Sequence, residues 1–329
     1  MNLKDEINRL KKELDVTLVA HFYQRDEVFE LADITGDSLE LAKKAKETKS
    51  KYIVFCGVGF MGESVKVLSP EKTVLMPKIA CCAMARMIDE GYYEQNLKTI
   101  NEAGIPNENI LPITYINSSA AVKAKVGQMG GMVCTSSNAY KIIEKGLQSG
   151  KKIFFVPDRC LGQNFAKQMK LKSAIVGDGS DLKEADIICY NGFCSVHQLF
   201  TVEDVEFYRE KYPDILVAVH PECDPSVCDA ADFVGSTSQL ITYIKELPLD
   251  QKVVVGTEFN MVNRLRDKNT YILSSTKPEC PTMNETTLED VYKTLKSIED
   301  NNINEETLIK VDDDVIKWAK VALERMLEV

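Results

Sequence analysis

Short apolar runs alternate with amphipathic segments along most of this chain. Residues 52–56 and 153–156 are short apolar runs. Residues 2–14 form an amphipathic segment, in which apolar positions recur every three or four residues. Continuous apolar runs bounded by polar residues are typical of buried strands, and the three-to-four spacing is typical of helices. Strands and helices in alternation favour parallel sheets with helices on both faces. The pattern therefore predicts an α/β protein.

The pattern near the start of the chain returns near its end. His21 and His220 each follow an apolar run, and an Ala-Asp pair begins 11 positions after each histidine. Ser38 or Thr237 then opens a helical pattern, and a glycine lies 19 positions beyond each of these hydroxyl residues. Matching intervals of this kind indicate an internal repeat.

A looser copy of the repeat lies between the other two. In this copy an apolar run leads to Tyr115 and Asn117, and Ser136 precedes a helical pattern. Each copy ends near a cysteine, and these cysteines are Cys82, Cys194 and Cys280. Repeats of about 100 residues have the size of domains rather than of solenoid units.

We therefore expect three similar three-layer αβα domains with short parallel sheets around a pseudo-threefold axis. The active site should lie at the centre, because ligands bind at the carboxyl ends of parallel strands. The predicted domain bounds are 1–86, 87–193 and 194–280. The remaining segment, 281–329, has amphipathic helices at 286–299 and 305–328, and we expect it to complete the first domain.

Composition narrows the class of protein and its partners. Of the 329 residues, 44% are hydrophobic and 27% are charged, and the net charge is −10. This charge argues against nucleic acid as a partner. Because the chain has no signal-peptide core and no apolar run of membrane-spanning length, we expect a cytoplasmic protein that does not bind membranes. Ten cysteines in a reducing compartment are then core thiols, metal ligands or catalytic groups.

All three histidines of the chain, His21, His197 and His220, lie beside the repeated motifs. Glu222 lies two residues after His220, so in an extended chain both side chains point to the same side. A carboxylate beside an imidazole suits proton abstraction next to a carbonyl group, although the same pair could simply orient the loop. Tyr23 has the same spacing from His21 and could donate a proton or anchor a ligand.

Ser38, Ser136 and Thr237 occupy equivalent positions at three predicted helix starts. Each is suited to be an N-cap, a role that requires no further function. Helix N-termini also bind anions through free backbone N–H groups, so three of them around one centre would form a phosphate pocket. Lys123 could add positive charge to this pocket, or it could be a solvated helix residue.

The cysteines that end the repeats could supply three thiolates to one centre. None of them lies in a Cys-x-x-Cys pair, and for any one of them taken alone a buried core thiol is the preferred interpretation. Three thiolates on a four-iron cluster would leave one iron free to act as a Lewis acid. Zinc with three thiolates and a water is the competing metal site. Cys81 lies beside Cys82, which leaves the first ligand open between the two.

These residues belong to motifs by which the chain resembles a known family, the quinolinate synthases of bacterial NAD biosynthesis. The resemblance extends over nearly the whole chain. The motifs that carry the resemblance, in the family's order, are His21-Phe22-Tyr23-Gln24, Gly36-Asp37-Ser38, Gly59-Phe60-Met61, Tyr115-Ile116-Asn117, Thr135-Ser136-Ser137-Asn138, Phe193-Cys194-Ser195-Val196-His197, His220-Pro221-Glu222-Cys223, Gly235-Ser236-Thr237-Ser238, Gly256-Thr257-Glu258 and Cys280-Pro281-Thr282-Met283.

The resemblance implies a [4Fe–4S] cluster held by Cys82, Cys194 and Cys280. It implies the condensation of iminoaspartate with dihydroxyacetone phosphate to quinolinate, with loss of phosphate and two waters. An open iron of the cluster would act as a Lewis acid. The resemblance also suggests a functional coupling to an L-aspartate oxidase, because iminoaspartate is unstable.

Roles for individual residues follow from the resemblance as well. Glu222 and His220 would transfer protons, Tyr23 would also be catalytic, and His197 would act close to the cluster. The residues implied to bind substrate, including its phosphate and carboxylate groups, are His21, Ser38, Tyr115, Asn117, Ser136, Ser236 and Thr237.

Two positions depart from the family pattern. Cys81 stands where the family usually has glycine, and Cys280 stands alone where some longer members have a Cys-x-x-Cys-x-x-Cys run, so no redox disulfide is expected there. Two other interpretations fit the same residues. One is an iron–sulfur hydro-lyase that acts on a hydroxy acid without condensation, and the other is a non-catalytic protein that binds phosphorylated metabolites.

Overall fold

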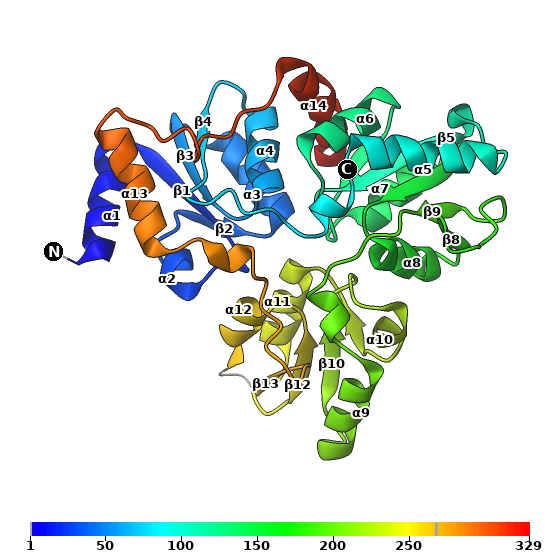
Figure 1. Ribbon diagram of the computed structural model, residues 1–329. Helices are drawn as coiled ribbons and strands as arrows, with labels where there is room; N and C mark the ends of the chain where they lie inside the picture. The colour runs from blue at the N-terminus through cyan, green and yellow to red at the C-terminus, as the bar shows by residue number, and fades with distance from the viewer. Residues whose placement is uncertain (1, 267–268) are drawn as a thin grey trace.

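The computed structural model describes residues 2–266 and 269–329 and has three lobes, each built on its own sheet (Figure 1). The strand orders are β2-β1-β3-β4, β6-β5-β7-β9-β8 and β11-β10-β12-β13. The strand pairs in all three sheets are parallel. The predicted α/β architecture of three similar αβα domains is confirmed.

The first domain lies at the upper left of Figure 1 and has a four-stranded sheet. Its strands are β1 (Val16–His21), β2 (Ile34–Gly36), β3 (Tyr52–Cys56) and β4 (Thr73–Leu75). Its helices are α1 (Leu3–Glu13), α2 (Asp26–Phe29), α3 (Ser38–Glu47) and α4 (Gly59–Leu68), followed by the short η1 (Ala85–Met87). All six residues of β1 are buried, which explains why its sequence is almost continuously apolar.

The second domain, at the right of Figure 1, has one strand more than the others. Its strands are β5 (Ile110–Tyr115), β6 (Met132–Cys134), β7 (Lys152–Val156), β8 (Ser173–Ile175) and β9 (Ile187–Cys189). Its helices are α5 (Glu90–Glu102), η2 (Asn107–Asn109), α6 (Ala120–Gln128), α7 (Ala139–Leu147) and α8 (Arg159–Gln168).

The third domain lies below the other two in Figure 1. After η3 (His197–Leu199), its strands are β10 (Leu216–Val219), β11 (Phe233–Val234), β12 (Val253–Gly256) and β13 (Thr270–Ile272). Its helices are α9 (Val202–Lys211), α10 (Pro225–Asp229), α11 (Thr237–Glu246) and α12 (Phe259–Asn263). The chain then returns upward through η5 (Met283–Glu285).

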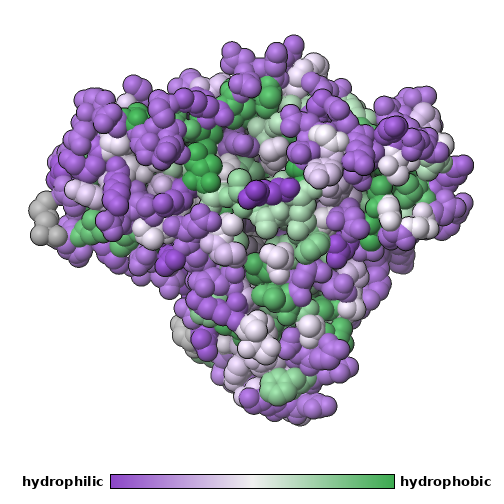
Figure 2. Space-filling model, viewed as in Figure 1, coloured by the Kyte–Doolittle hydropathy of each residue, from purple (hydrophilic) through white to green (hydrophobic). Residues whose placement is uncertain are grey.

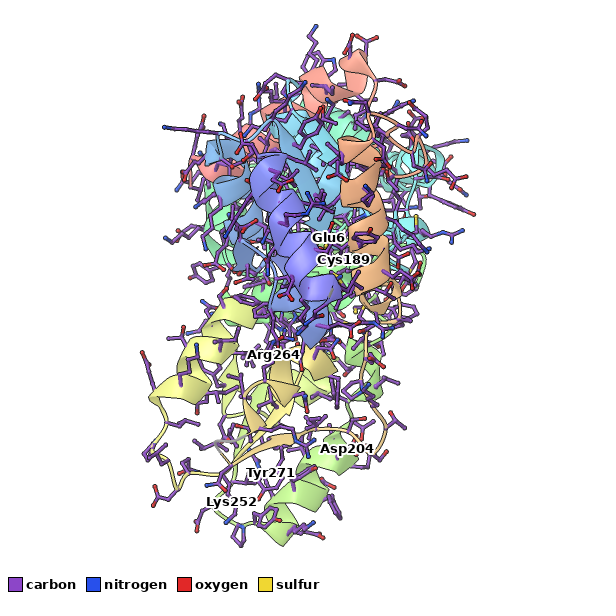
Figure 3. All side chains as sticks on the ribbon, turned by 90° about the vertical axis from the view of Figure 1, so that its left-hand side faces the viewer. Glu6, Cys189, Asp204, Lys252, Arg264 and Tyr271 are labelled. Carbon is purple, nitrogen blue, oxygen red and sulfur yellow. The ribbon has the colours of Figure 1, made fainter. Side chains whose placement is uncertain are left out.

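The two C-terminal helices cover different domains. Helix α13 (Leu288–Glu299) packs beside α1, as Figures 1 and 3 both show, whereas α14 (Asp313–Leu327) packs on α6 and β6 of the second domain. Helix α14 also contacts α4 of the first domain, so it bridges the first and second domains rather than completing the first alone. The reason is a close fit to α6, where Gly127 lies directly against the backbone of Trp318.

Polar contacts join the domains around their common junction. The guanidinium of Arg264, the C-cap residue of α12, donates to the backbone oxygens of Phe22 and Gln24 and to Asp26 Oδ1, the last at 2.6 Å. Figure 3 shows Arg264 at the boundary between the third domain and the first. In Figure 2 apolar residues gather where the three lobes meet, between hydrophilic rims. Among the described residues, no helix has both the length and the apolar character needed to cross a membrane.

Candidate active site

Strands β1, β5 and β10, one in each sheet, carry equivalent residues at their carboxyl ends. The last pair of β1 with β2 is His21 with Gly36, and the last pair of β5 with β6 is Tyr115 with Cys134. The residue that follows each strand donates its backbone N–H to the carbonyl of that partner, at 3.1 Å in the first domain and 2.8 Å in the second. In the third sheet the same register places His220 directly after the last β10–β11 pair.

Each domain therefore contributes three side chains at matching positions. The first lies at the strand end and the second lies two residues later. The third is the first residue of the next long helix in the first and third domains, and it lies three residues before that helix in the second. The nine residues are His21, Tyr23 and Ser38 of the first domain, Tyr115, Asn117 and Ser136 of the second, and His220, Glu222 and Thr237 of the third. All nine line a single cavity at the junction of the domains.

The three cysteines expected to be ligands line this same cavity. They are Cys82, Cys194 and Cys280, whereas the neighbouring Cys81 is exposed and does not line it. Burial raises the pKa of Cys82 to about 12 and also raises the pKa values of the other two thiols. Among the described residues that line the cavity, none is lysine or arginine. A metal centre would supply the positive charge that three thiolates need in such a site.

Both oxygens of the Glu222 carboxylate make hydrogen bonds within the cavity. The hydroxyl of Tyr115 donates to its Oε1 at 2.6 Å, and Nδ1 of His197 lies 3.1 Å from its Oε2. Burial acts to raise the pKa of Glu222, but His197, His220 and the Tyr115 hydroxyl together lower that pKa by more. Glu222 is therefore a buried carboxylate in contact with hydrogen-bond donors from two domains.

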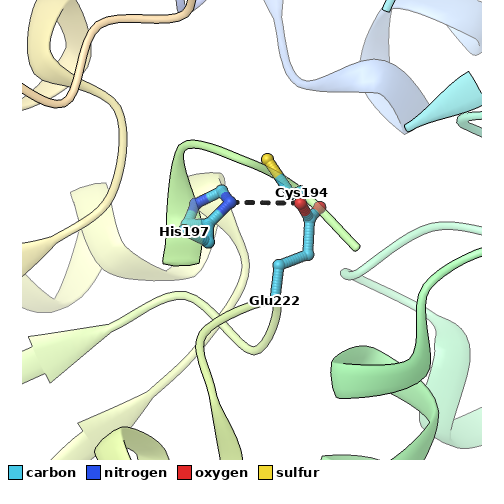
Figure 4. Close-up of side chains that lie close together, drawn as sticks. All are labelled: Cys194, His197 and Glu222. Carbon is cyan, nitrogen blue, oxygen red and sulfur yellow. Dashed lines mark hydrogen bonds and ion pairs between the residues drawn. The ribbon is translucent and has the colours of Figure 1, made fainter. Parts of the chain in front are cut away.

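Cys194, His197 and Glu222 also form a compact group of potential metal ligands (Figure 4). One potential ligand atom from each lies within 4.8 Å of those of the other two. Figure 4 shows the thiol of Cys194 beside the hydrogen bond between His197 and Glu222. A thiol, an imidazole and a carboxylate in this arrangement are suited to zinc or iron. The cavity thus has a donor set that fits a metal cofactor.

The two strand-end histidines are held in the same tautomer. Nδ1 of His21 accepts the backbone N–H of Tyr23 at 3.1 Å, and Nδ1 of His220 accepts the backbone N–H of Glu222 at 3.3 Å. Burial lowers the pKa of His21 to about 4 and that of His220 to about 3, so both rings are neutral at pH 7. The proton must then be on Nε2, from which His220 donates to Ser136 Oγ at 3.3 Å.

The Tyr23 hydroxyl lies between two threonines of the third domain. Its oxygen is 2.9 Å from Thr237 Oγ1 and 3.1 Å from Thr257 Oγ1. Burial, and then the charge of Glu222, raise the pKa of Tyr23 well above its usual value, so the hydroxyl remains protonated. It is available as a hydrogen-bond donor at the junction of the first and third domains.

Sequence reasoning assigned no role to three polar residues that belong to this site. Thr257 contacts Tyr23 and His197, Glu258 accepts the backbone N–H of Cys280 at 3.3 Å, and Asp37 lines the cavity. Burial raises the pKa of Glu258 to about 8. A signal was present for the first two, since they follow the end of β12 as His220 follows the end of β10.

Two further candidates lie outside the cavity lining. Ser236 is the N-cap of α11, where its Oγ accepts the backbone N–H of Gln239, and it lines a second cavity between the second and third domains. Lys123 is fully buried, and its ammonium group donates to the backbone oxygens of Ile116 and Ser118. It therefore supports the turn that carries Asn117.

Comparisons with known proteins agree with this geometry. The sequence model of the family "Quinolinate synthetase A protein" matches residues 5–328. A quinolinate synthase of Helicobacter pylori (strain HPAG1) is 57% identical over 333 residues, which cover 99% of this chain and 98% of that protein. A quinolinate synthase of Acidobacterium capsulatum is 42% identical over 331 residues, which cover 95% of this chain and 88% of that protein.

Proposed function

Because this chain belongs to the quinolinate synthetase A family, we propose that it condenses iminoaspartate with dihydroxyacetone phosphate to quinolinate in NAD biosynthesis. The reaction would release one phosphate and two waters, which balances the atoms of the two substrates. The observation that supports this proposal best is the convergence of three equivalent sets of side chains, with the three cysteines that end the repeats, on one cavity.

The start of one helix from each domain would bind the phosphate. Ser38 and Thr237 begin α3 and α11, and Ser136 lies just before α7. Backbone N–H groups at helix starts, with adjacent hydroxyls, bind anions without needing lysine or arginine. This arrangement suits a cavity whose described lining has no cationic side chain of that kind.

The carboxylate groups of iminoaspartate would be met by neutral donors. Tyr23, Tyr115 and Asn117 present hydroxyl and amide groups to the cavity, and Nε2 of His21 carries a proton that can be donated. Neutral donors orient an anion without forming an ion pair that would have to be broken at product release. The bound substrates would be fixed relative to Glu222.

Glu222 would move protons between carbon and oxygen of the bound substrates. Its carboxylate can accept a proton from a carbon next to a carbonyl or imine, and the Tyr115 hydroxyl at 2.6 Å can return a proton to oxygen. Nε2–H of His220 can stabilise a developing enolate, as a neutral imidazole donor. Such a set is suited to the isomerisation and to the two losses of water.

Cys82, Cys194 and Cys280 would hold a [4Fe–4S] cluster, with His197 close to it. When bound, such a cluster with one open iron supplies a Lewis acid for a substrate oxygen. The fit rests on three partly buried cysteines that line one cavity, together with His197, and on the absence of lysine and arginine from the described lining. An L-aspartate oxidase would be a suitable source of iminoaspartate.

The test is quinolinate formation by protein purified without oxygen and loaded with iron and sulfide. Oxaloacetate with ammonia supplies iminoaspartate in the assay, and dihydroxyacetone phosphate is added. We expect quinolinate and inorganic phosphate to appear in equal amounts. Loaded protein that makes no quinolinate would show that the proposed function is wrong.

A further inference from the structure

One carboxylate joins all three domains beside the cavity. Oδ2 of Asp37, in the first domain, accepts the hydroxyl of Ser137 at 2.9 Å and the hydroxyl of Ser238 at 2.6 Å. Ser137 belongs to the second domain and Ser238 to the third. The other oxygen, Oδ1, accepts the backbone N–H groups of Leu39 and Glu40, both at 3.0 Å, and so caps α3. We call Asp37, Ser137 and Ser238 the junction triad.

The triad marks the place where the threefold repeat is broken. In the register of the strands, Asp37 is equivalent to Thr135 and Ser236, which bear hydroxyls. Ser137 and Ser238 are equivalent to Leu39, which has an apolar side chain. The first domain therefore has an acceptor where the others have hydroxyls, and it lacks the hydroxyl that the others direct toward that acceptor. Helix capping alone does not require an aspartate in place of a hydroxyl residue here, because serine or threonine also caps a helix.

Each member of the triad is the immediate neighbour in sequence of one residue of the proposed phosphate site. Ser38 follows Asp37, Ser136 precedes Ser137, and Thr237 precedes Ser238. The triad and the proposed phosphate site are thus formed by neighbouring residues of the same three segments. A movement of any one domain that lengthens a triad hydrogen bond also displaces a phosphate-binding hydroxyl.

We propose that Asp37 is a positioning residue that fixes the three helix starts at the spacing which binds the phosphate of the substrate. The inference rests on the proposed function and deepens it. Hydrogen bonds to a carboxylate are stronger than those between neutral groups, and they are stronger still at a buried position such as that of Asp37, which is 7% exposed. The phosphate site is then assembled before substrate arrives, which lowers the cost of binding.

Asp37→Asn separates positioning from capping. The oxygen of an asparagine can cap α3 as that of aspartate does, but its NH2 group can only donate to the serine hydroxyls, so the two charged hydrogen bonds are replaced by weaker neutral ones. Ser137→Ala and Ser238→Ala each remove one donor and leave the cap intact. Asp89→Asn, at the exposed N-cap of α5, and Ser149→Ala, whose hydroxyl bonds only within its own turn, are matched controls.

We expect Asp37→Asn in the iron-loaded holoprotein to raise the KM for dihydroxyacetone phosphate about tenfold, which is 1.4 kcal/mol. The kcat at saturating substrate, the iron content and the unfolding midpoint should stay near those of the wild type, as in the two controls. Adding Ser238→Ala to Asp37→Asn should raise KM by less than the product of the two single effects, because both changes remove the same charged hydrogen bond. A merely structural role would instead lower kcat, iron content and midpoint together.

An unchanged KM in Asp37→Asn, or KM effects that multiply in the double variant, would overturn the inference while leaving the proposed function intact. A wild-type holoprotein that makes no quinolinate would overturn the proposed function instead. The triad can then still be tested through the rise of the unfolding midpoint caused by inorganic phosphate. We expect that rise in the wild type and a smaller one in Asp37→Asn; equal shifts contradict the inference.

Discussion

Glu222 receives its hydrogen bonds from two domains, which makes it the most informative single residue of the cavity. Sequence reasoning could select it, because it lies two residues beyond a histidine at a strand end. The same reasoning could not find its closest partner, since Tyr115 lies 107 positions away and only the packing of the second domain on the third joins them. Local spacing predicts which residues reach a site, whereas the contacts between them depend on the tertiary structure.

Glu222→Gln should keep the fold and lose most of the activity. The amide retains the shape of the side chain but cannot accept a proton, and general acid–base groups contribute about 10² to 10⁴ in kcat. The measurement is the rate of quinolinate formation at equal iron content. Glu246→Gln, on the exposed end of α11, is the control and should match the wild type. Wild-type activity in Glu222→Gln would remove this residue from the chemistry.

Lys123 is a residue whose environment the sequence left open. It is 0% exposed, and burial lowers its pKa to about 7, with Glu63 acting in the opposite direction. The lysine of an unfolded chain has a pKa of about 10.4, so between these two pH values the unfolded chain binds a proton that the folded protein lacks. The free energy of unfolding must therefore rise with pH across this window.

Lys123→Met should remove this contribution. The unfolding free energy of the wild type minus that of the variant is expected to increase from pH 7 to pH 10, by at most about 1.4 kcal/mol per pH unit. Denaturant titrations of both proteins at several pH values provide the measurement, and the titration of other groups cancels in the difference. A difference that does not change with pH would contradict the burial of an uncharged amine.

At the scale of elements, the strands were easier to predict than the final helix. The segment 305–328 has helical spacing, yet α14 begins only at Asp313. The reason is a backbone pairing, in which residues 307–309 lie along the edge of β4 and bond to Val74 and Met76. An edge strand with free N–H and C=O groups attracts such a segment. Periodicity in the segment itself does not report the presence of that edge.

Gly127→Ala tests the packing of α14 on α6. A Cβ at this position would lie 2.1 Å from the backbone oxygen of Trp318, so the two helices would have to separate. Overpacking of this kind costs about 1 to 3 kcal/mol, and we expect a lower unfolding midpoint and faster hydrogen exchange in α14. Gly91→Ala, where the new methyl would meet only a side-chain oxygen at 3.3 Å, is the control. Unchanged exchange in α14 would contradict the close contact.

At the scale of the whole molecule, matching intervals along the sequence predicted three similar domains. The register of the strands explains why these intervals match. Strand-end residues face a shared centre, so their order along the chain repeats. The exceptions to the repeat, such as Asp37 and the extra strand of the second sheet, could not be predicted from it. Asp37 lies where the three domains meet, and the extra strand lies at the outer edge of its own sheet, so neither is constrained by the positions that repeat.

The central claim is that the three cysteines at the ends of the repeats hold a single cluster. The most direct measurement is the iron and acid-labile sulfide content of anaerobically purified wild type and four cysteine variants. We expect about four irons per chain in the wild type and in Cys81→Ser, and almost none in Cys82→Ser, Cys194→Ser or Cys280→Ser. Full iron content in any of the last three, or loss of iron in Cys81→Ser, would contradict the account.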